Sequence, residues 1–148
     1  MIIALGCDHG GLELKNQIKE YLLSLHHEVK DVGTHTKDSC SYSEYGIRCA
    51  EAVVRNEADK GIVICTTGEG IMIAVNKVKG IRCGLPYNDF TCEYMRRHND
   101  CNMMSLGAKF VTLEDAKRYI DIFLNTPFDG GRHSVRVNYI KDYEDKKI

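Results

Sequence analysis

A cysteine that ends an apolar run and precedes a glycine-bearing loop is the first feature of the sequence that could do chemistry. The run Ile62–Ile64 leads into Cys65, residues 66–70 form the loop, and an amphipathic run over 71–77 follows. This order predicts a strand, a tight turn and a helix. The loop N–H groups and the helix N-terminus would then point over the end of the strand, where an anion could bind.

Cys65 has two interpretations. A helix N-terminus favours the thiolate, which acts as a base or nucleophile, and the same N–H groups could stabilise an oxyanion beside it. The alternative is a buried structural thiol, the commonest state of a free cysteine. The chain has seven cysteines, an odd number with no CxxC spacing. We therefore expect neither a disulfide framework nor a structural zinc site, and a reducing cytoplasm fits best.

Two further places carry histidines that could act in catalysis. Asp8 and His9 follow the short apolar run Ile2–Leu5. They could be a helix N-cap and a turn histidine, or they could transfer protons and bind an anion. His98 stands just before another predicted strand, and it is either an ordinary surface histidine or a catalytic group.

Two arginines follow the Gly130–Gly131 pair. Arg132 and Arg136 are four residues apart, so a helix would place both on one face. Two guanidinium groups near a helix start could clamp a phosphate, although a solvated basic face is the alternative. Tyr42 and Lys109 carry no signal of their own.

Apolar runs alternate with helical periods along the whole chain. Strands are predicted over residues 2–5, 29–32, 62–65, 81–85 and 102–106. Helices are predicted over residues 12–25, 45–54, 71–77, 90–97 and 113–124, with a last one beginning near Arg132, and residues 34–43 are predicted as a loop.

This alternation predicts an α/β fold in which helices cover both faces of a parallel sheet. Ligands of such folds bind beyond the carboxyl ends of the strands, near the point where the strand order switches. We therefore expect Asp8–His9, Gly33–Thr34 and Cys65–Gly70 to meet at one edge of the sheet.

Length and composition place further limits on the function. A chain of 148 residues with 43% hydrophobic and 28% charged residues fits a single globular domain over residues 1–148. The net charge of −1 gives no basic field for nucleic acid or a membrane surface, and no apolar segment is long enough to span a membrane. The sequence has no P-loop and no HExxH motif, and Ile73 stands where a dinucleotide fingerprint would need its third glycine.

Six short segments carry a family resemblance. They are GCDHGG at 6–11, DVGTHT at 31–36, GIVICTTGEGIMIAVNK at 61–77, KGIRC at 79–83, RRHNDCN at 96–102 and GGRHSVRV at 130–137. Together and in this order they resemble the type B ribose-5-phosphate isomerases, within the sugar-phosphate isomerase family that also holds galactose-6-phosphate isomerase subunits.

The resemblance implies a Rossmann-like three-layer sandwich with a five-stranded parallel sheet. It also implies interconversion of D-ribose 5-phosphate and D-ribulose 5-phosphate through an enediolate, with no cofactor and no metal. The implied assembly is a homodimer or a tetramer, in which the segment around His98 reaches into the active site of the neighbouring subunit.

The resemblance also implies roles for individual residues at the reacting end of the sugar. Cys65 is the base that moves the proton between C1 and C2, and Asp8 shuttles protons between the sugar oxygens. The Thr67 hydroxyl helps to hold the oxyanion. The backbone N–H groups that share this task belong to Thr66, Thr67, Gly68, Glu69 and Gly70.

The remaining roles concern the ring and the phosphate. By resemblance His98 opens the furanose ring, with Asn99 beside it, and Tyr42 packs against the substrate. The expected phosphate ligands are His9, Arg132 and Arg136, and Lys109 falls where many relatives have an arginine near the phosphate.

Three departures from the family pattern concern substrate preference. Thr66 replaces a glycine and must keep a negative φ, Glu69 must point to solvent, and Ser43 replaces a proline. An allose-6-phosphate or galactose-6-phosphate isomerase is the enzymatic alternative, and a flavodoxin-like nucleotide-binding module is the non-enzymatic one. Together His98, Arg132 and Arg136 favour the pentose activity.

Overall fold

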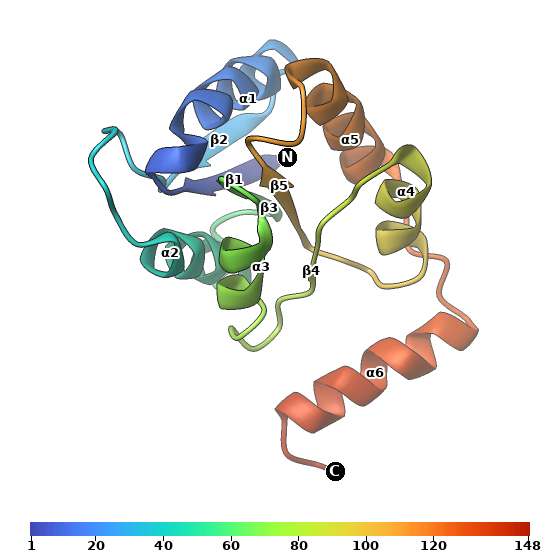
Figure 1. The fold of residues 1–148 in the computed structure, drawn as a ribbon. Helices are drawn as coiled ribbons and strands as arrows, with labels where there is room; N and C mark the ends of the chain where they lie inside the picture. Colours follow the sequence, from blue (N-terminus) through green and yellow to red (C-terminus); the bar gives the residue numbers. More distant parts are fainter.

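The computed structural model describes residues 1–148 as a parallel sheet with helices on both of its faces (Figure 1). The strands are β1 (Ile2–Cys7), β2 (Glu28–Asp31), β3 (Lys60–Cys65), β4 (Cys83–Gly84) and β5 (Met103–Gly107). Their order across the sheet is β2-β1-β3-β5-β4, and every neighbouring pair is parallel. The predicted five-stranded parallel sheet is confirmed.

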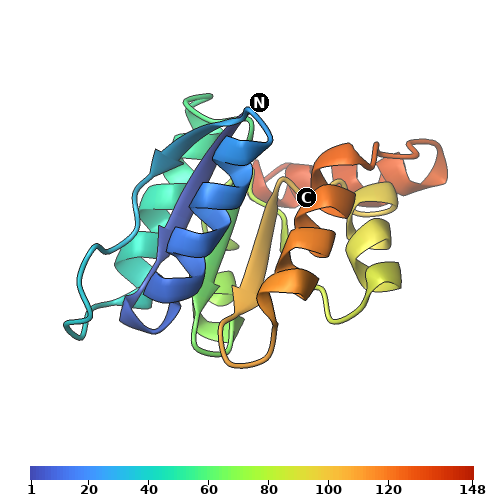
Figure 2. The same cartoon turned by 90° about the horizontal axis from the view of Figure 1, so that it is seen from above.

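Helices cover the sheet from two sides (Figures 1 and 2). The helices are α1 (Leu12–Ser24), α2 (Tyr42–Val54), α3 (Glu69–Val75), α4 (Asp89–Arg97), α5 (Leu113–Asn125) and α6 (Arg132–Glu144), with a 3₁₀ turn at His9–Gly11. One apolar core joins the sheet to α1, α4 and α5, and a second joins it to α2 and α3. The three-layer sandwich is therefore confirmed.

The alternation of side chains along β3 decides where the cysteine thiol lies. Ile62 and Ile64 belong to the core beneath α1 and α5, whereas Val63 and Cys65 belong to the core beneath α2 and α3. Successive residues of a strand point to opposite faces of the sheet. The thiol of Cys65 consequently lies on the face that α3 covers.

The strand order switches between β1 and β3. From β1 the chain crosses to β2 on one side, and from β3 it crosses to β4 and β5 on the other. The connections therefore part above the carboxyl ends of β1 and β3, where parallel folds bind ligands. Asp8 follows the first of these ends and Thr66 follows the second.

Several predicted boundaries are wrong. Helix α2 begins at Tyr42, inside the predicted loop 34–43, because the Ser41 hydroxyl caps it by accepting the Glu44 N–H at 3.3 Å. Helix α3 begins at Glu69 instead of Ile71, and β4 spans two residues instead of the predicted 81–85.

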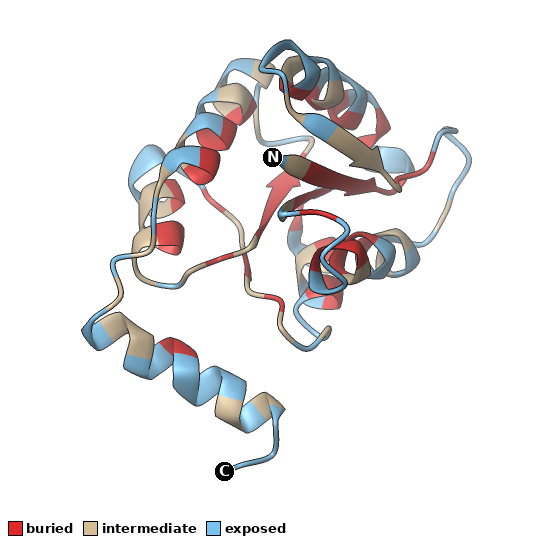
Figure 3. Cartoon of the chain, turned by 180° about the vertical axis from the view of Figure 1, so that it is seen from behind, coloured by how far each residue is buried: buried red, intermediate tan, exposed pale blue.

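Helix α6 extends away from the layered body, and most of its surface is exposed (Figure 3). Val135, Tyr139 and Tyr143 are 71%, 65% and 70% exposed, although their spacing puts these apolar side chains on one face. Val137 is the buried residue of this helix. No helix of the chain combines the length and the apolarity that crossing a membrane requires.

Candidate active site

The loop after β3 wraps around the thiol of Cys65. This side chain is only 5% exposed, and its Sγ accepts the backbone N–H of Gly68 at 3.2 Å. Gly68 has a φ of 81°, which glycine adopts without strain, and this conformation turns the chain into α3. This hydrogen bond holds the sulfur at the start of α3, beside the N–H groups of the loop.

The end of β5 holds this loop from the other side. The backbone N–H groups of Ala108 and Lys109 donate to the carbonyls of Cys65 and Thr66 at 2.9 and 3.1 Å. The buried Ser105 hydroxyl donates to the carbonyl of Gly68 at 2.6 Å. These contacts fix the loop and also place Lys109 beside it.

Asp8 and His9 lie at the adjacent end of β1. The Asp8 carboxylate is 6% exposed, and its Oδ1 accepts the N–H groups of Gly10 and Gly11 at 3.0 and 3.2 Å. Asp8 is thus the N-cap of the 3₁₀ turn, as one of its two interpretations predicted. His9 is exposed, and its Nδ1 accepts the N–H of Cys40 at 3.2 Å, which leaves Nε2 as the donor of the neutral ring.

Tyr42 lies directly against the same loop. A Cβ at Gly70 would meet the ring of Tyr42 at 2.8 Å, so only a glycine allows this contact as it stands. The structure therefore brings together the following predicted site residues at the carboxyl edge of the sheet: Asp8, His9, Tyr42, Cys65, Thr66, Thr67, Gly68, Glu69, Gly70 and Lys109. We call them the carboxyl-edge group.

The other predicted residues lie together between the C-terminus of α4 and the start of α6. His98 ends α4, and its ring stacks on that of His133 with the ring centroids 3.9 Å apart. Arg132 and Arg136 lie one turn apart, and Nη1 of Arg136 donates to the Arg132 carbonyl at 3.1 Å. We call His98, Asn99, Arg132, His133 and Arg136 the α4–α6 group.

The α4–α6 group is electrostatically suited to an anion. Partial burial and the adjacent positive groups, His98 first among them, lower the pKa of His133 below its usual value. Side-chain ligand atoms of His98, His133 and Asp129 come within 4.8 Å of one another. However, the two rings are stacked at 13° rather than converging on one point, and Asp129 is paired with Arg97. With two further arginines close by, this geometry favours a phosphate over a metal cation.

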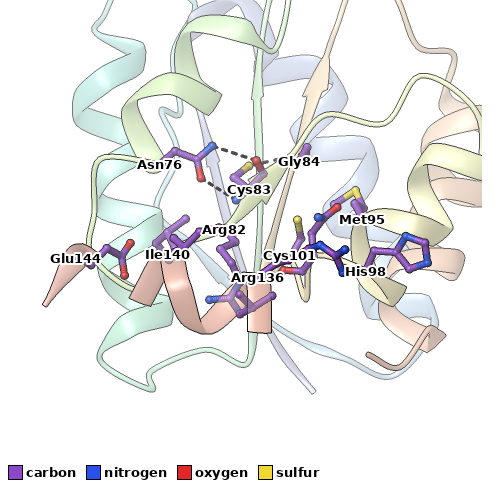
Figure 4. Close-up of a pocket in the computed structure, with 13 residues that line it drawn as sticks. Asn76, Arg82, Cys83, Gly84, Met95, His98, Cys101, Arg136, Ile140 and Glu144 are labelled. Atoms are coloured by element: carbon purple, nitrogen blue, oxygen red, sulfur yellow. Dashed lines mark hydrogen bonds between the residues drawn. The ribbon is translucent and has the colours of Figure 1, made fainter. Parts of the chain in front are cut away.

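A cavity of about 380 Å³ adjoins this group (Figure 4). His98, Asn99 and Arg136 line it together with side chains of β4 and the inner face of α6. The cavity therefore opens beside the guanidinium and imidazole groups that could receive a charged ligand.

Within one chain the two groups lie at opposite edges of the sheet. Cys65 ends β3, whereas His98 and Asn99 precede β5, whose five residues span about 16 Å at the usual rise per residue. Within a single chain the predicted site residues therefore form two separate groups.

Comparison with known proteins identifies the family of the chain. A sequence model of the Ribose/Galactose Isomerase family matches residues 3–140. The chain belongs to this family. It is 41% identical over 145 residues to ribose-5-phosphate isomerase B of Escherichia coli, covering 98% of this chain and 97% of that protein.

Solved structures of family members share the fold over nearly their whole length. Ribose-5-phosphate isomerase B of Clostridium thermocellum superposes with a TM-score of 0.97 at 44% identity, covering 100% of both chains. The Mycoplasma genitalium ribose-5-phosphate isomerase B with bound ribulose-5-phosphate superposes with a TM-score of 0.94 at 36% identity, covering 98% of this chain and 97% of that one.

The structure shows how the chain accommodates two of its departures from the family pattern. Thr66 keeps a negative φ, as predicted. Its hydroxyl has room because residue 10 is a glycine: a Cβ at that position would lie 2.3 Å from the hydroxyl oxygen of Thr66. Glu69 is exposed and stands in the first turn of α3, where a carboxylate complements the helix dipole.

Sequence reasoning missed several residues that shape the site. Ser105 gave a signal, since a hydroxyl inside an apolar strand needs a partner, but the partner could not be known. Gly107 approaches Thr67 and Arg82 contacts Asn99, and in both pairs the partners are distant in the sequence. His133 gives no signal of its own between two arginines.

Proposed function

We propose that this protein is an isomerase that interconverts D-ribose 5-phosphate and D-ribulose 5-phosphate in the cytoplasm. The observation that supports this most strongly is the buried Cys65 thiol, hydrogen-bonded to the N–H of Gly68 at the switch point of the sheet. The names of the E. coli and C. thermocellum relatives and the ribulose-5-phosphate bound to the M. genitalium protein point the same way.

The thiolate of Cys65 removes the proton from C2 of the open-chain aldose. The electron pair moves into the C1 carbonyl and gives an enediolate, whose oxygen accepts hydrogen bonds from the loop N–H groups and the Thr67 hydroxyl. Asp8 moves a proton between O1 and O2. Return of the proton from sulfur to C1 gives the ketose, so no electron acceptor is needed.

The phosphate is held by cationic groups from both halves of the site. Arg132, Arg136, His9 and Lys109 supply guanidinium, imidazole and ammonium donors for a dianion. This binding energy positions a small sugar for reaction at C1 and C2. His98 opens the furanose ring, and Asn99 orients the sugar beside it.

The complete site forms in a homodimer, or in a tetramer built from such dimers. The α4–α6 group of one subunit would cover the carboxyl-edge group of its partner, since the two lie too far apart within a chain. The exposed apolar face of α6, formed by Val135, Tyr139 and Tyr143, supplies a surface for this pairing.

A coupled assay with three substrates tests the proposed function. Ribose 5-phosphate should be turned over with a kcat/KM at least tenfold above those of allose 6-phosphate and galactose 6-phosphate, because one extra carbon changes the distance between the phosphate and the reacting carbon. Preferred turnover of a hexose phosphate would contradict the pentose assignment. Turnover of none of them, with flavin absorbance in the purified protein, would support a nucleotide-binding module.

A further inference from the structure

The short segment that follows His98 is held in an unfavourable backbone conformation. Asp100 has a φ of 48°, a left-handed conformation in which a residue with a side chain is strained. The strained residue lies two positions after His98 and next to Asn99. Something outside the segment must hold it there.

Arg82, which precedes β4, contacts this segment through its whole guanidinium edge. Its Nε donates to the carbonyls of Asn99 and Asp100 at 3.0 and 3.2 Å. Its Nη2 donates to the same Asp100 carbonyl at 2.8 Å and to Oδ2 of the Asp100 carboxylate at 3.1 Å. The Arg82 side chain is 13% exposed, so little water competes for these bonds.

A second arginine, Arg96 of α4, binds the same segment. Nη1 of Arg96 donates to Oδ1 of Asp100 at 2.9 Å and to the Cys101 carbonyl at 2.6 Å. Its Nε donates to the carbonyl of Thr126, which tethers the chain leading to α6. Arg82 and Arg96 therefore bind different oxygens of the Asp100 carboxylate. They also donate hydrogen bonds to the backbone carbonyls of the residues before and after Asp100.

We propose that Arg82 is a positioning residue, which sets the place of His98 and Asn99 by holding Asp100 and the carbonyls beside it. Arg82 also lines the cavity together with His98 and Arg136 (Figure 4). Its guanidinium, however, donates to the backbone carbonyls of Asn99 and Asp100. This inference rests on the proposed function, in which His98 opens the sugar ring.

A double-mutant cycle tests the positioning role of Arg82. The variants are Arg82→Met, His98→Asn and the pair, with Arg55→Met as the control, since Arg55 is an exposed arginine paired with Glu51. Arg82→Met should lower kcat/KM for ribose 5-phosphate by about 10- to 100-fold, because small misplacements of a catalytic group have effects of this size. If Arg82 acts through His98, the double variant should lie within about twofold of His98→Asn alone.

Two results would overturn the inference. One is an Arg82→Met variant as active as the Arg55→Met control, and the other is a further tenfold loss when Arg82→Met is added to His98→Asn. Arg82→Lys serves as the second variant should the methionine variant fail to fold. A lysine keeps the charge but cannot reach both carbonyls and the carboxylate, so it should show the same loss.

An NMR measurement separates this inference from the proposed function. The His98 ring lies over His133 and edge-on to Tyr94 at 4.5 Å, so its Cε1–H resonance is shifted by both rings. In Arg82→Met this resonance should move toward the position of an unstructured histidine, and in Arg55→Met it should not. An unmoved resonance refutes the positioning role whatever the substrate proves to be, whereas a wild-type protein inactive on ribose 5-phosphate refutes only the function.

Discussion

Cys65 differs from the other buried thiols in its surroundings, because it ends β3 and therefore lies beside the start of α3. Burial raises the pKa of Cys7 and Cys92 to about 12, and that of Cys83 well above its usual value. These thiols are structural. Cys65 is equally buried, but its sulfur accepts the Gly68 N–H at the start of α3. The strand, loop and helix around it were predictable from sequence because glycine and apolar spacing are local signals.

At the same scale, Arg136 should act on substrate binding. Replacing Arg136 with alanine removes a charged donor that the proposed site aims at the phosphate. The expected result is a KM for ribose 5-phosphate raised at least tenfold, about 1.4 kcal/mol, with a smaller change in kcat. Steady-state kinetics beside an Arg55→Ala control would measure it, and an unchanged KM would remove Arg136 from the phosphate clamp.

At the scale of elements, the loop after β3 depends on the end of β5. A Cβ at Gly107 would lie 2.4 Å from the carbonyl oxygen of Thr67, so any side chain there must push the loop away. Such a contact is invisible in the sequence, because the two residues are far apart along the chain. This is also why the register between β3 and β5 could not be predicted while the strands themselves could.

Gly107→Ala should therefore impair catalysis more than folding. A shift of the loop by a fraction of an ångström to an ångström misplaces the oxyanion donors, and kcat should fall by about 10- to 100-fold. Kinetics together with urea unfolding would show it. A Gly107→Ala variant with wild-type kcat would mean that the loop adapts freely.

A buried ion pair fixes α1 to the end of β2. Nζ of Lys15 lies 2.8 Å from Oδ2 of Asp31, and the two side chains are 0% and 8% exposed. Burial by itself would raise the pKa of Asp31, but the hydrogen bond from Lys15 and its charge outweigh burial and lower it. The stabilisation is therefore present above the unfolded pKa, near 3.9, and is lost as the pH falls through the folded value.

Lys15→Met should lower the unfolding free energy at pH 7 by about 3 kcal/mol, because it leaves a buried carboxylate without its main partner. Lys19→Met is the matched control. Lys19 contacts the same carboxylate at 3.4 Å but is 39% exposed, so its loss should cost less than about 1 kcal/mol. Urea unfolding measures both losses of unfolding free energy, and equal losses for Lys15→Met and Lys19→Met would contradict the expected difference between them.

At the scale of the whole molecule, the predicted site residues divide into two groups. Sequence pattern placed Asp8–His9 and Cys65–Gly70 at one edge correctly, because the rule for parallel sheets is general. It could not place the His98 segment, since α4 returns the chain to the opposite edge before β5 begins. Nor could it foresee that α6 would extend from the body with an apolar face exposed.

This division predicts complementation between impaired variants. A Cys65→Ala protein should be inactive and a His98→Asn protein should keep only residual activity, but a mixed dimer should contain one intact site. After subunit exchange, an equal mixture should recover about a quarter of wild-type activity, as random pairing in a two-fold dimer requires. Mass spectrometry of the mixed dimer would verify that the subunits have exchanged. If they have exchanged and no activity is recovered, each site forms within one subunit.

The most direct test is the turnover of Cys65→Ala on ribose 5-phosphate. Loss of the base should lower kcat by about 10³-fold or more, while the affinity for a non-reacting phosphate ligand, measured by calorimetry, stays within about twofold of wild type. That pair of results would assign Cys65 to the proton transfer rather than to binding. Turnover near the wild-type rate by a folded Cys65→Ala protein would contradict the account.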